Sequence, residues 1–503
     1  MARMIDIILY NPQSSASRKP VLPMSLMAVG AVLEGDYEYI IVDGNLERDP
    51  LSALEKALEA AGPRPVLGMT VMPGPQLQQA VGLCQQLKDR HPELIIVWGG
   101  YFPSQHWDVC LRSDTVDYVV RGHGEMVFRQ LLDALDSSNG LEPDISTLKS
   151  IPGLAYRDET GEPVSLSMAP IPHPKKLPDW NYERVDVPRY VRKTFLGSRT
   201  LGYHSSYGCP FFCNFCAVVT MVNGRWFPQS AEYVANIART YHDRWRINAI
   251  EFYDNNFFTH QARVAEFSER IMDLGLAWWG EGRIDTMQKY SHRTWELMRD
   301  AGLRMVFMGA ESGSDETLKR MDKGGQMSTE KTLEMAKLMR SYNIVPEFSF
   351  VMGNPPDPET DMRQTMEFIR KVKRVNPDCE IIMYLYTPVP LAGDLYDEAQ
   401  TEGFAFPTTL EEWVSPEWLD FSQRRSMTMP WVKRSLQEQI HDFERVLNAY
   451  YPTSTDTKLT KAWRRVLRAA SAWRYHLRFY HFPIELRALH RIVAYQRPET
   501  SGF

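Results

Sequence analysis

The chain is short of the features that define several classes of protein. Apolar residues make up 44% of its 503 residues, yet no run of them approaches the roughly 18 consecutive positions of a membrane-spanning helix. Basic residues are not in excess, because 57 Lys and Arg against 63 Asp and Glu give a net charge of -6. Nucleic-acid binding depends on basic surfaces that displace counterions. The charge balance therefore argues against a general nucleic-acid binder.

Cysteine is also scarce, with six in the whole chain. The first residues, MARMIDIILYNP, contain a short apolar run and no small-residue cleavage site, so we expect no secretory signal and a cytoplasmic location. A reducing cytoplasm disfavours a disulfide framework. Three of the cysteines, Cys84, Cys110 and Cys379, are scattered, and we expect them to be buried small apolar side chains.

The chain is longer than one hydrophobic core usually organises, so about three domains are expected. Residues 1–140 alternate apolar strand patterns with helical patterns. The expected strands cover 5–10, 37–42, 65–70, 94–98 and 116–120, and the expected helices 26–33, 51–61 and 76–90. Short apolar runs separated by helices predict an α/β fold, a parallel sheet covered on both faces. This is a doubly wound, Rossmann-like domain whose ligand belongs at the carboxyl ends of the strands.

Residues 141–195 are rich in proline and charge, which predicts a linker. A second series of strands and helices follows in residues 196–405. Its six expected strands cover 200–205, 249–253, 277–281, 305–308, 346–352 and 380–386. Six such units predict a partial (β/α)6 version of the TIM barrel, with its active site at the carboxyl ends of the strands. Residues 406–503 are predicted to form a mostly helical, basic C-terminal domain.

Three cysteines are clustered in the string Gly208-Cys-Pro-Phe-Phe-Cys-Asn-Phe-Cys216, directly after the first strand of this second series. Cys209, Cys213 and Cys216 can hold three irons of a cubane and leave the fourth iron open to a small molecule. Structural zinc is the alternative, but it needs a fourth protein ligand, and His204 is the one nearby candidate.

With an aromatic residue, Phe215, directly before the third cysteine, this motif resembles that of the radical S-adenosylmethionine (SAM) superfamily. The resemblance implies a [4Fe-4S] cluster on Cys209, Cys213 and Cys216, and SAM bound to the open iron. It also implies that a 5'-deoxyadenosyl radical, formed by reductive cleavage of SAM, abstracts hydrogen from the substrate. It assigns SAM contacts to Phe215 and to three residues after successive strands, Asp254, Arg283 and Glu311. A zwitterionic amino acid needs both a cation and an anion, which Arg283 and Glu311 would provide.

In this subgroup the N-terminal domain resembles a cobalamin-binding domain. The landmarks follow the strands of residues 1–140 and are Ser25, Thr70, Met72, Gly99, Gly100, Gly122, His123 and Glu125. Glycines let the backbone approach a large planar ligand. No histidine precedes His91, so the histidine ligand to cobalt found in other cobalamin domains is absent here, and we expect Met72 to pack beneath the ring. His123 stands where relatives more often carry Glu.

The two resemblances together imply a cobalamin-dependent radical SAM enzyme that methylates an unactivated carbon. The alternative in the same architecture is a non-methylating radical reaction, such as the anaerobic oxidative cyclisation of a magnesium-porphyrin ester or a ring rearrangement. A third hypothesis, of another class, is a non-catalytic corrinoid carrier or a zinc-stabilised binding protein. The expected partners are a small-molecule substrate, lipid-like or a tetrapyrrole, and an electron donor such as flavodoxin or ferredoxin, with no nucleic acid.

The end of the chain has a different charge from the rest. From residue 458 onward it has ten basic residues against two acidic ones, Glu485 and Glu499. Apolar residues recur there at helical spacing, at Trp463, Leu467, Ala470, Trp473 and Leu477. This pattern predicts a helix that either packs on the barrel with a solvated basic face, or contacts an anionic membrane surface or a substrate as a lid.

Overall fold

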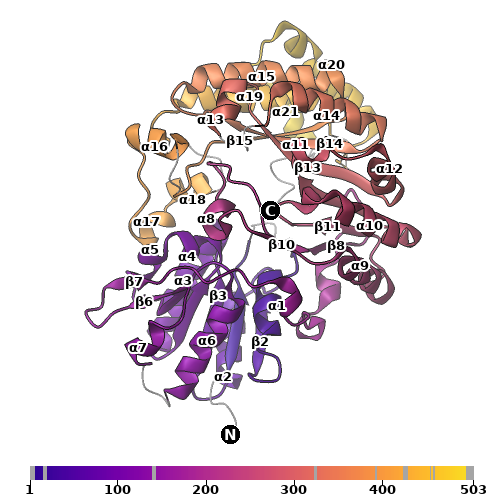
Figure 1. Ribbon diagram of the computed structural model, residues 1–503. Helices are drawn as coiled ribbons and strands as arrows, with labels where there is room; N and C mark the ends of the chain where they lie inside the picture. Colours follow the sequence, from indigo (N-terminus) through magenta and orange to yellow (C-terminus); the bar gives the residue numbers. More distant parts are fainter. Residues whose placement is uncertain are drawn as a thin grey trace. The chain divides into compact units, whose positions relative to one another are not determined.

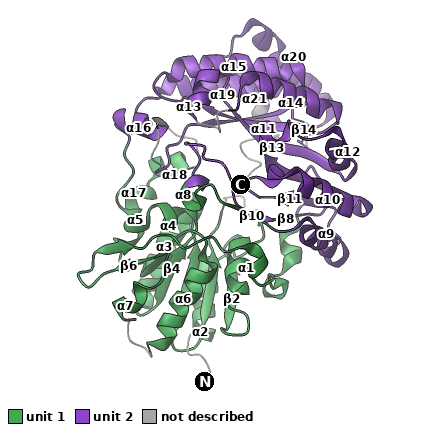
Figure 2. Cartoon of the chain, viewed as in Figure 1, with its two compact units in different colours: residues 1–191, 220–228, 405–426 green, residues 192–219, 229–404, 427–503 purple. Residues whose placement is uncertain are grey.

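The computed structural model (Figure 1) describes residues 6–14, 20–138, 143–321, 326–390, 394–422, 429–453, 455–456 and 459–493. Lys458, Arg497 and Glu499 of the predicted basic tail lie outside this set. The chain divides into two compact units (Figure 2). Unit 1 comprises residues 1–191, 220–228 and 405–426, and unit 2 comprises residues 192–219, 229–404 and 427–503.

Unit 1 is built on a parallel sheet whose first five strands have the order β2-β1-β3-β4-β5. These are β1 (Ile7–Asn11), β2 (Tyr39–Asp43), β3 (Val66–Thr70), β4 (Ile95–Gly99) and β5 (Tyr118–Val120). The helices are α1 (Met24–Ala31), α2 (Pro50–Ala60), α3 (Pro75–Arg90), α4 (Tyr101–Gln105), α5 (Trp107–Leu111), α6 (Gly124–Ser137) and α7 (Ile145–Leu148). Every residue of β1 is buried, which explains its continuous apolar run. The predicted doubly wound domain is confirmed, and its strand order reverses between β1 and β3, where such folds bind ligands.

The segment predicted to be a linker contains structure that the sequence did not reveal. Strands β6 (Leu154–Arg157) and β7 (Pro163–Ser165) extend the sheet of unit 1 in the antiparallel sense. Arg157 fixes β6, because its guanidinium donates to the backbone carbonyls of Leu111, Ser113 and Val116 at 2.6–2.9 Å. The proline that suggested a linker, Pro163, begins the edge strand, where a missing N–H is tolerated. Three short 3-10 turns follow, at Pro174–Lys176, Tyr182–Arg184 and Val187–Tyr190.

Unit 2 contains six parallel strands that neighbour one another in chain order, which confirms the predicted partial (β/α)6 barrel (Figure 1). They are β8 (Thr200–Tyr203), β11 (Ala249–Phe252), β12 (Ala277–Gly282), β13 (Leu303–Glu311), β14 (Val345–Met352) and β15 (Glu380–Leu385). The main helices between them are α9 (Ala231–Trp245), α10 (Gln261–Ile271), α12 (His292–Asp300), α14 (Thr329–Ser341) and α15 (Pro358–Val375). Short helices α11 (Ile284–Met287) and α13 (Asp315–Arg320) lie in the loops that follow β12 and β13.

The described residues after position 405 are mostly helical, as predicted. Helix α16 (Asp394–Thr401) precedes this region, whose own helices are α17 (Leu410–Trp413), α18 (Pro416–Ser422), α19 (Arg434–Tyr450), α20 (Lys461–Leu477) and α21 (Ile484–Ile492). They are shared between the units, because residues 405–426 cluster with unit 1 and residues 427–503 with unit 2. None of the helices described is long and apolar enough to cross a membrane.

Candidate functional site

The three clustered cysteines lie on the loop between β9 (Ser206–Gly208) and α8 (Val218–Val222). Gly208 has a φ of +85°, a backbone conformation that suits glycine and turns the chain into the loop. Cys213 is buried, while Cys209 and Cys216 are partly exposed. Asn214 anchors the loop, because its backbone N–H donates to the Met321 carbonyl at 3.3 Å and its amide to the Arg320 carbonyl at 2.6 Å.

The cysteine thiols are close enough to affect one another's protonation. Burial raises the pKa of Cys216 to about 12, and the nearby Cys213, Cys209 and Glu311 add to the shift. Burial likewise raises the pKa of Cys209. Within the described residues, no three Cys, His, Asp or Glu side chains form a group that could hold one metal ion, as structural zinc would require. A cubane differs, since each thiolate binds a separate iron and the three sulfurs surround the cluster instead of meeting at one ion.

Arg283, just past the end of β12, is held against the cysteine loop. Its Nη1 donates to Cys213 Sγ at 3.1 Å, and its Nε and Nη2 donate to the two carboxylate oxygens of Asp285 at 3.0 and 2.9 Å. The guanidinium carbon lies 3.8 Å from the centre of the Phe211 ring. Arg283 is only 6% exposed. The loop is therefore provided with a buried, oriented cation. Asp285 was visible in the sequence string E-G-R-I-D but was not predicted to act.

Glu311 is the last residue of β13 and adopts an unusual backbone conformation. Its φ is +62°, in the left-handed region that non-glycine residues rarely enter, and the β13–β14 register shifts between Gly309 and Glu311. The side chain is buried and near enough to raise the pKa of Cys216. Strained residues of this kind cluster at functional sites. The structure thus brings Glu311 and Arg283 to the same loop of unit 2.

Asp254, just after the end of β11, holds the chain segment that precedes the cysteine loop. It is fully buried and accepts hydrogen bonds from the Ser205 backbone at 2.9 Å, from the Ser205 hydroxyl at 2.8 Å and from the Ser206 hydroxyl. These bonds fix the segment that leads into the cysteine loop, so Asp254 is a positioning residue. Its contact with SAM stays a prediction. The same holds for Phe215, which lies partly buried in the loop itself.

Asn256, two residues further along, was not singled out from the sequence. It is fully buried, and neither its side-chain nitrogen nor its side-chain oxygen has a hydrogen-bond partner among the described residues. An unpartnered buried amide costs about 1–3 kcal/mol of stability. A buried donor and acceptor at the carboxyl end of a barrel strand is suited to read a polar ligand. The signal available in the sequence was the polar string D-N-N after an apolar strand.

Carboxyl groups line the strands of the barrel below this edge. Burial, followed by the neighbouring Glu380, raises the pKa of Glu347 to about 8. Burial, followed by Asp254, raises the pKa of Glu281 to about 8 as well. Trp279 Nε1 donates to Glu347 at 3.1 Å. At neutral pH both groups are therefore mostly protonated, and they present the interior with neutral donors.

The cobalamin landmarks of unit 1 gather at the carboxyl edge of its sheet. Ser25 Oγ lies 3.5 Å from Thr70 Oγ1. Gly100 follows Gly99 at the end of β4 with a φ of +102°, and a Cβ there would lie 3.0 Å from Thr70 Oγ1 and from the Val71 nitrogen. Only glycine lets these two strand ends come so close. The Gly122 N–H, with φ +76°, donates to Ser104 Oγ at 2.8 Å.

Met72 and Glu125 also lie at this edge of the sheet. Met72 is 48% exposed, and its backbone N–H donates at 3.0 Å to Gln76, whose own amide donates to the Pro12 carbonyl at 3.0 Å. Glu125, in the first turn of α6 after His123, is buried with one carboxylate oxygen unpartnered among the described residues. An open glycine edge, an exposed thioether and a buried free acceptor fit a large planar ligand with amide substituents, as cobalamin is.

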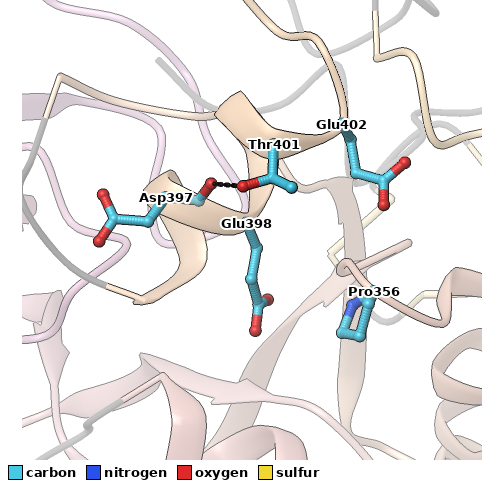
Figure 3. Close-up of a pocket in the computed structure, with 5 residues that line it drawn as sticks. All are labelled: Pro356, Asp397, Glu398, Thr401 and Glu402. Atoms are coloured by element: carbon cyan, nitrogen blue, oxygen red, sulfur yellow. Dashed lines mark hydrogen bonds between the residues drawn. The ribbon is translucent and has the colours of Figure 1, made fainter.

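One hollow of about 390 Å³ lies elsewhere in unit 2. It is lined by Pro356, Asp397, Glu398, Thr401 and Glu402 (Figure 3), and the Thr401 hydroxyl donates to the Asp397 carbonyl at 2.9 Å. Glu398 faces Arg320, whose Nη1 lies 3.1 Å away. None of the predicted site residues lines this hollow, so we do not assign the reaction to it.

Comparison with known proteins agrees with this geometry. Residues 203–369 match the Radical SAM superfamily and residues 16–132 match the B12 binding domain. The chain is 27% identical to an uncharacterized methyltransferase of Pyrococcus horikoshii, over 74% of this chain and 79% of the relative. It is 26% identical to the anaerobic magnesium-protoporphyrin IX monomethyl ester cyclase of Synechocystis, over 76% of this chain and 74% of the relative.

A solved structure extends the likeness to the whole architecture. The cobalamin-dependent S-adenosylmethionine radical enzyme OxsB, with aqua-cobalamin bound, superposes with a TM-score of 0.67 at 17% identity, over 97% of this chain and 75% of that one. At this identity the likeness concerns the fold. Together with the two domain matches, it establishes that the chain belongs to the cobalamin-binding radical SAM enzymes, whose cofactors are a [4Fe-4S] cluster, SAM and cobalamin.

Proposed function

We propose that this enzyme transfers a methyl group to an unactivated carbon of a small molecule. The observation that carries the proposal is the cysteine loop with Arg283 and Glu311 beside it, in a chain that also contains a B12-binding domain. The named methyltransferase among the relatives supports it. When bound, the cluster and SAM supply a 5'-deoxyadenosyl radical that removes a hydrogen atom from the substrate, and cobalamin supplies the methyl group.

In unit 2, some residues would hold the cofactors and others would orient the loop that holds them. Cys209, Cys213 and Cys216 would hold the cluster, and Arg283 and Glu311 would offer a cation and an anion to the carboxylate and amino groups of SAM. Phe215 would lie beside them. Asp254 keeps the entry to the loop in place through Ser205 and Ser206, and Asn256 would read a polar group of the bound ligand.

Unit 1 would supply the cobalamin site. We assign the contacts to the residues at the carboxyl edge of its sheet, namely Ser25, Thr70, Met72, Gly99, Gly100, Gly122, His123 and Glu125. Met72 would pack beneath the ring without a histidine ligand. For the domain boundaries, we assign residues 1–140 to cobalamin, 141–195 to the connection, 196–405 to the radical SAM core and 406–503 to the C-terminal helices.

The test is anaerobic reconstitution with iron, sulfide and hydroxocobalamin, followed by reductant, SAM and candidate substrates. Methyl transfer requires both 5'-deoxyadenosine and S-adenosylhomocysteine among the products. Cys213→Ser should abolish the cluster absorption and both products, while Cys379→Ser, a buried cysteine outside the cysteine loop, should keep them. Product formation with 5'-deoxyadenosine but without S-adenosylhomocysteine would contradict methyl transfer.

That second outcome would support an oxidative cyclisation or ring rearrangement, which the likeness to the magnesium-protoporphyrin ester cyclase favours. The same relative makes a tetrapyrrole one candidate substrate, with lipid-like molecules the other. An electron donor such as flavodoxin or ferredoxin would reduce the cluster. We place the reaction in the cytoplasm, because all six cysteines are free and such a compartment keeps thiols reduced.

A further inference from the structure

Helix α20 has two apolar faces, and only one of them is covered. On the covered face Leu467 is fully buried, and the Tyr475 ring stacks on Tyr450 at a centroid distance of 4.4 Å. The other face carries Trp463, Val466, Trp473 and Leu477, at steps of three, seven and four residues. Their exposed fractions rise along the helix from 36% for Trp463 to 72% for Leu477. A stripe at this spacing forms one continuous side of a helix.

The exposed stripe continues through the following turn and along α21. Phe479, Phe482, Ile484 and Ile492 are 48%, 66%, 70% and 73% exposed. The rings of Trp473 and Phe479 stack with centroids 5.9 Å apart, which joins the helix to the turn. Eight of the thirteen strongly exposed large apolar side chains of the described residues lie between positions 463 and 492. Such clustering marks an interaction surface, whereas scattered exposed apolar residues are ordinary. We call these eight residues the C-terminal apolar patch.

The charges around the patch have one sign. Six exposed basic residues share its two helices and the turn, Lys461, Arg465, Arg468, Arg478, Arg487 and Arg491. The only acidic residue among the described positions 459–493 is Glu485, which is paired with the buried Arg474. Arg478 and Arg487 form ion pairs with Glu367 and Asp442. The whole chain has a net charge of -6, so this positive surface is local.

We propose that the C-terminal apolar patch docks on the surface of an anionic lipid bilayer. Aromatic side chains beside arginine and lysine, with no exposed acid between them, match the boundary between acyl chains and negatively charged headgroups. A second copy of the chain fits less well, because a two-fold interface would bring the six basic residues of one patch against the same six of its partner. Since no described helix can cross a membrane, the docking is peripheral.

The docking proposal is independent of which radical reaction the enzyme performs. It assigns the C-terminal helices a function that the cluster and cobalamin sites do not use. A bilayer would also be the reservoir of an apolar substrate, and a docked enzyme would take such a substrate from the lipid phase rather than from water.

The test is sedimentation of the cofactor-loaded enzyme with vesicles of phosphatidylcholine alone and with vesicles of equal parts phosphatidylcholine and phosphatidylglycerol. We expect binding to the anionic vesicles that weakens as salt is raised, and little binding to the neutral ones. The triple variant Leu477→Ser, Phe482→Ser and Ile484→Ser should weaken this binding at least about tenfold. Met272→Ser, which alters an apolar side chain of unit 2 that is 41% exposed and outside the patch, should not.

A separate double variant tests the contribution of positive charge to the docking. Arg465 and Arg491 form no ion pair with other described residues, so Arg465→Gln with Arg491→Gln should reduce the salt dependence and the preference for anionic vesicles. Unchanged cluster and cobalamin spectra would show that every variant is folded. The proposal fails if the enzyme ignores anionic vesicles, if the triple variant binds them as well as the parent, or if the patch instead drives a dimer that the triple variant abolishes.

Discussion

Glu347 of the barrel gives the most direct test of the electrostatics of unit 2. It lies on β14, is 8% exposed, and accepts a hydrogen bond from Trp279 Nε1 at 3.1 Å. Burial and the neighbouring Glu380 raise its pKa from 4.5 to about 8. Glu347→Gln keeps the size of the side chain and an oxygen that can accept from Trp279, but it removes the titration. The substitution therefore changes charge with little change in packing.

The direction in which stability changes with pH follows from proton binding. Between pH 4.5 and about 8 the folded state holds a proton on Glu347 that the unfolded chain has released. The contribution of Glu347 to the free energy of unfolding is therefore fully present below pH 4.5. Above that pH it falls by about 1.4 kcal/mol for each pH unit until Glu347 ionises in the folded protein. From pH 6 to pH 8 the loss attributable to this one group amounts to about 2 kcal/mol. Glu347→Gln should remove that slope and be more stable than the parent at pH 8 by about 1–3 kcal/mol.

The assay is urea unfolding of both proteins at several pH values from 6 to 9, followed by tryptophan fluorescence. Glu281 has a similarly raised pKa, so part of the pH dependence should survive in the variant. Glu330→Gln, an exposed carboxyl on α14, serves as the matched control and should change neither the stability nor its slope appreciably. Equal slopes for the parent and Glu347→Gln would refute the conclusion that Glu347 is buried in its neutral form.

Three further predictions concern the cofactor sites. Arg283→Gln removes the cationic donor to Cys213 Sγ and should shift the cluster's reduction potential negative by on the order of tens of millivolts, seen in a redox titration followed by electron paramagnetic resonance. Gly100→Ala forces a Cβ to within 3.0 Å of its neighbours at a positive φ and should lower cobalamin retention in absorbance spectra, while Gly82→Ala, with open space around it, should not. Asn256→Leu should stabilise the cofactor-free protein by about 1–3 kcal/mol in urea unfolding, and it should weaken SAM binding measured by calorimetry. If the variant loses both stability and SAM binding, Asn256 has only a structural role.

The sequence predicted the strands well because burial dictates their composition. All eleven strands expected in the two sheets are present, and β14, for example, was predicted as 346–352 and runs over Val345–Met352. Strands β6 and β7 were missed since they are only four and three residues long, and β7 begins at a proline. Short edge strands carry too little apolar pattern to stand out from a linker.

The sequence named candidate site residues but could not give their geometry. The cysteine spacing identified the loop, and the order of strands placed Arg283 and Glu311 at one edge. The left-handed backbone of Glu311 depends on a register shift between two strands that are some 35 residues apart in sequence, which no local pattern reveals. The same applies to Asp254, whose partners Ser205 and Ser206 are about 50 residues away along the chain. Long-range pairing, rather than residue type, decides whether such a group binds a ligand or holds the scaffold.

Arg283 offsets an effect of burial that would hinder iron binding at the cysteine loop. Iron binds thiolates, but burial raises the pKa of Cys209 and Cys216 and so favours the neutral thiol. A cation near the sulfurs offsets that penalty, and Arg283 lowers the pKa of Cys209 while donating to Cys213 at 3.1 Å. Asp285 holds the guanidinium with two hydrogen bonds, which fixes its orientation before any ligand arrives. A lysine at this position would provide the charge without the fork that binds Asp285 and Cys213 together, so Arg283→Lys should assemble the cluster more slowly than the parent.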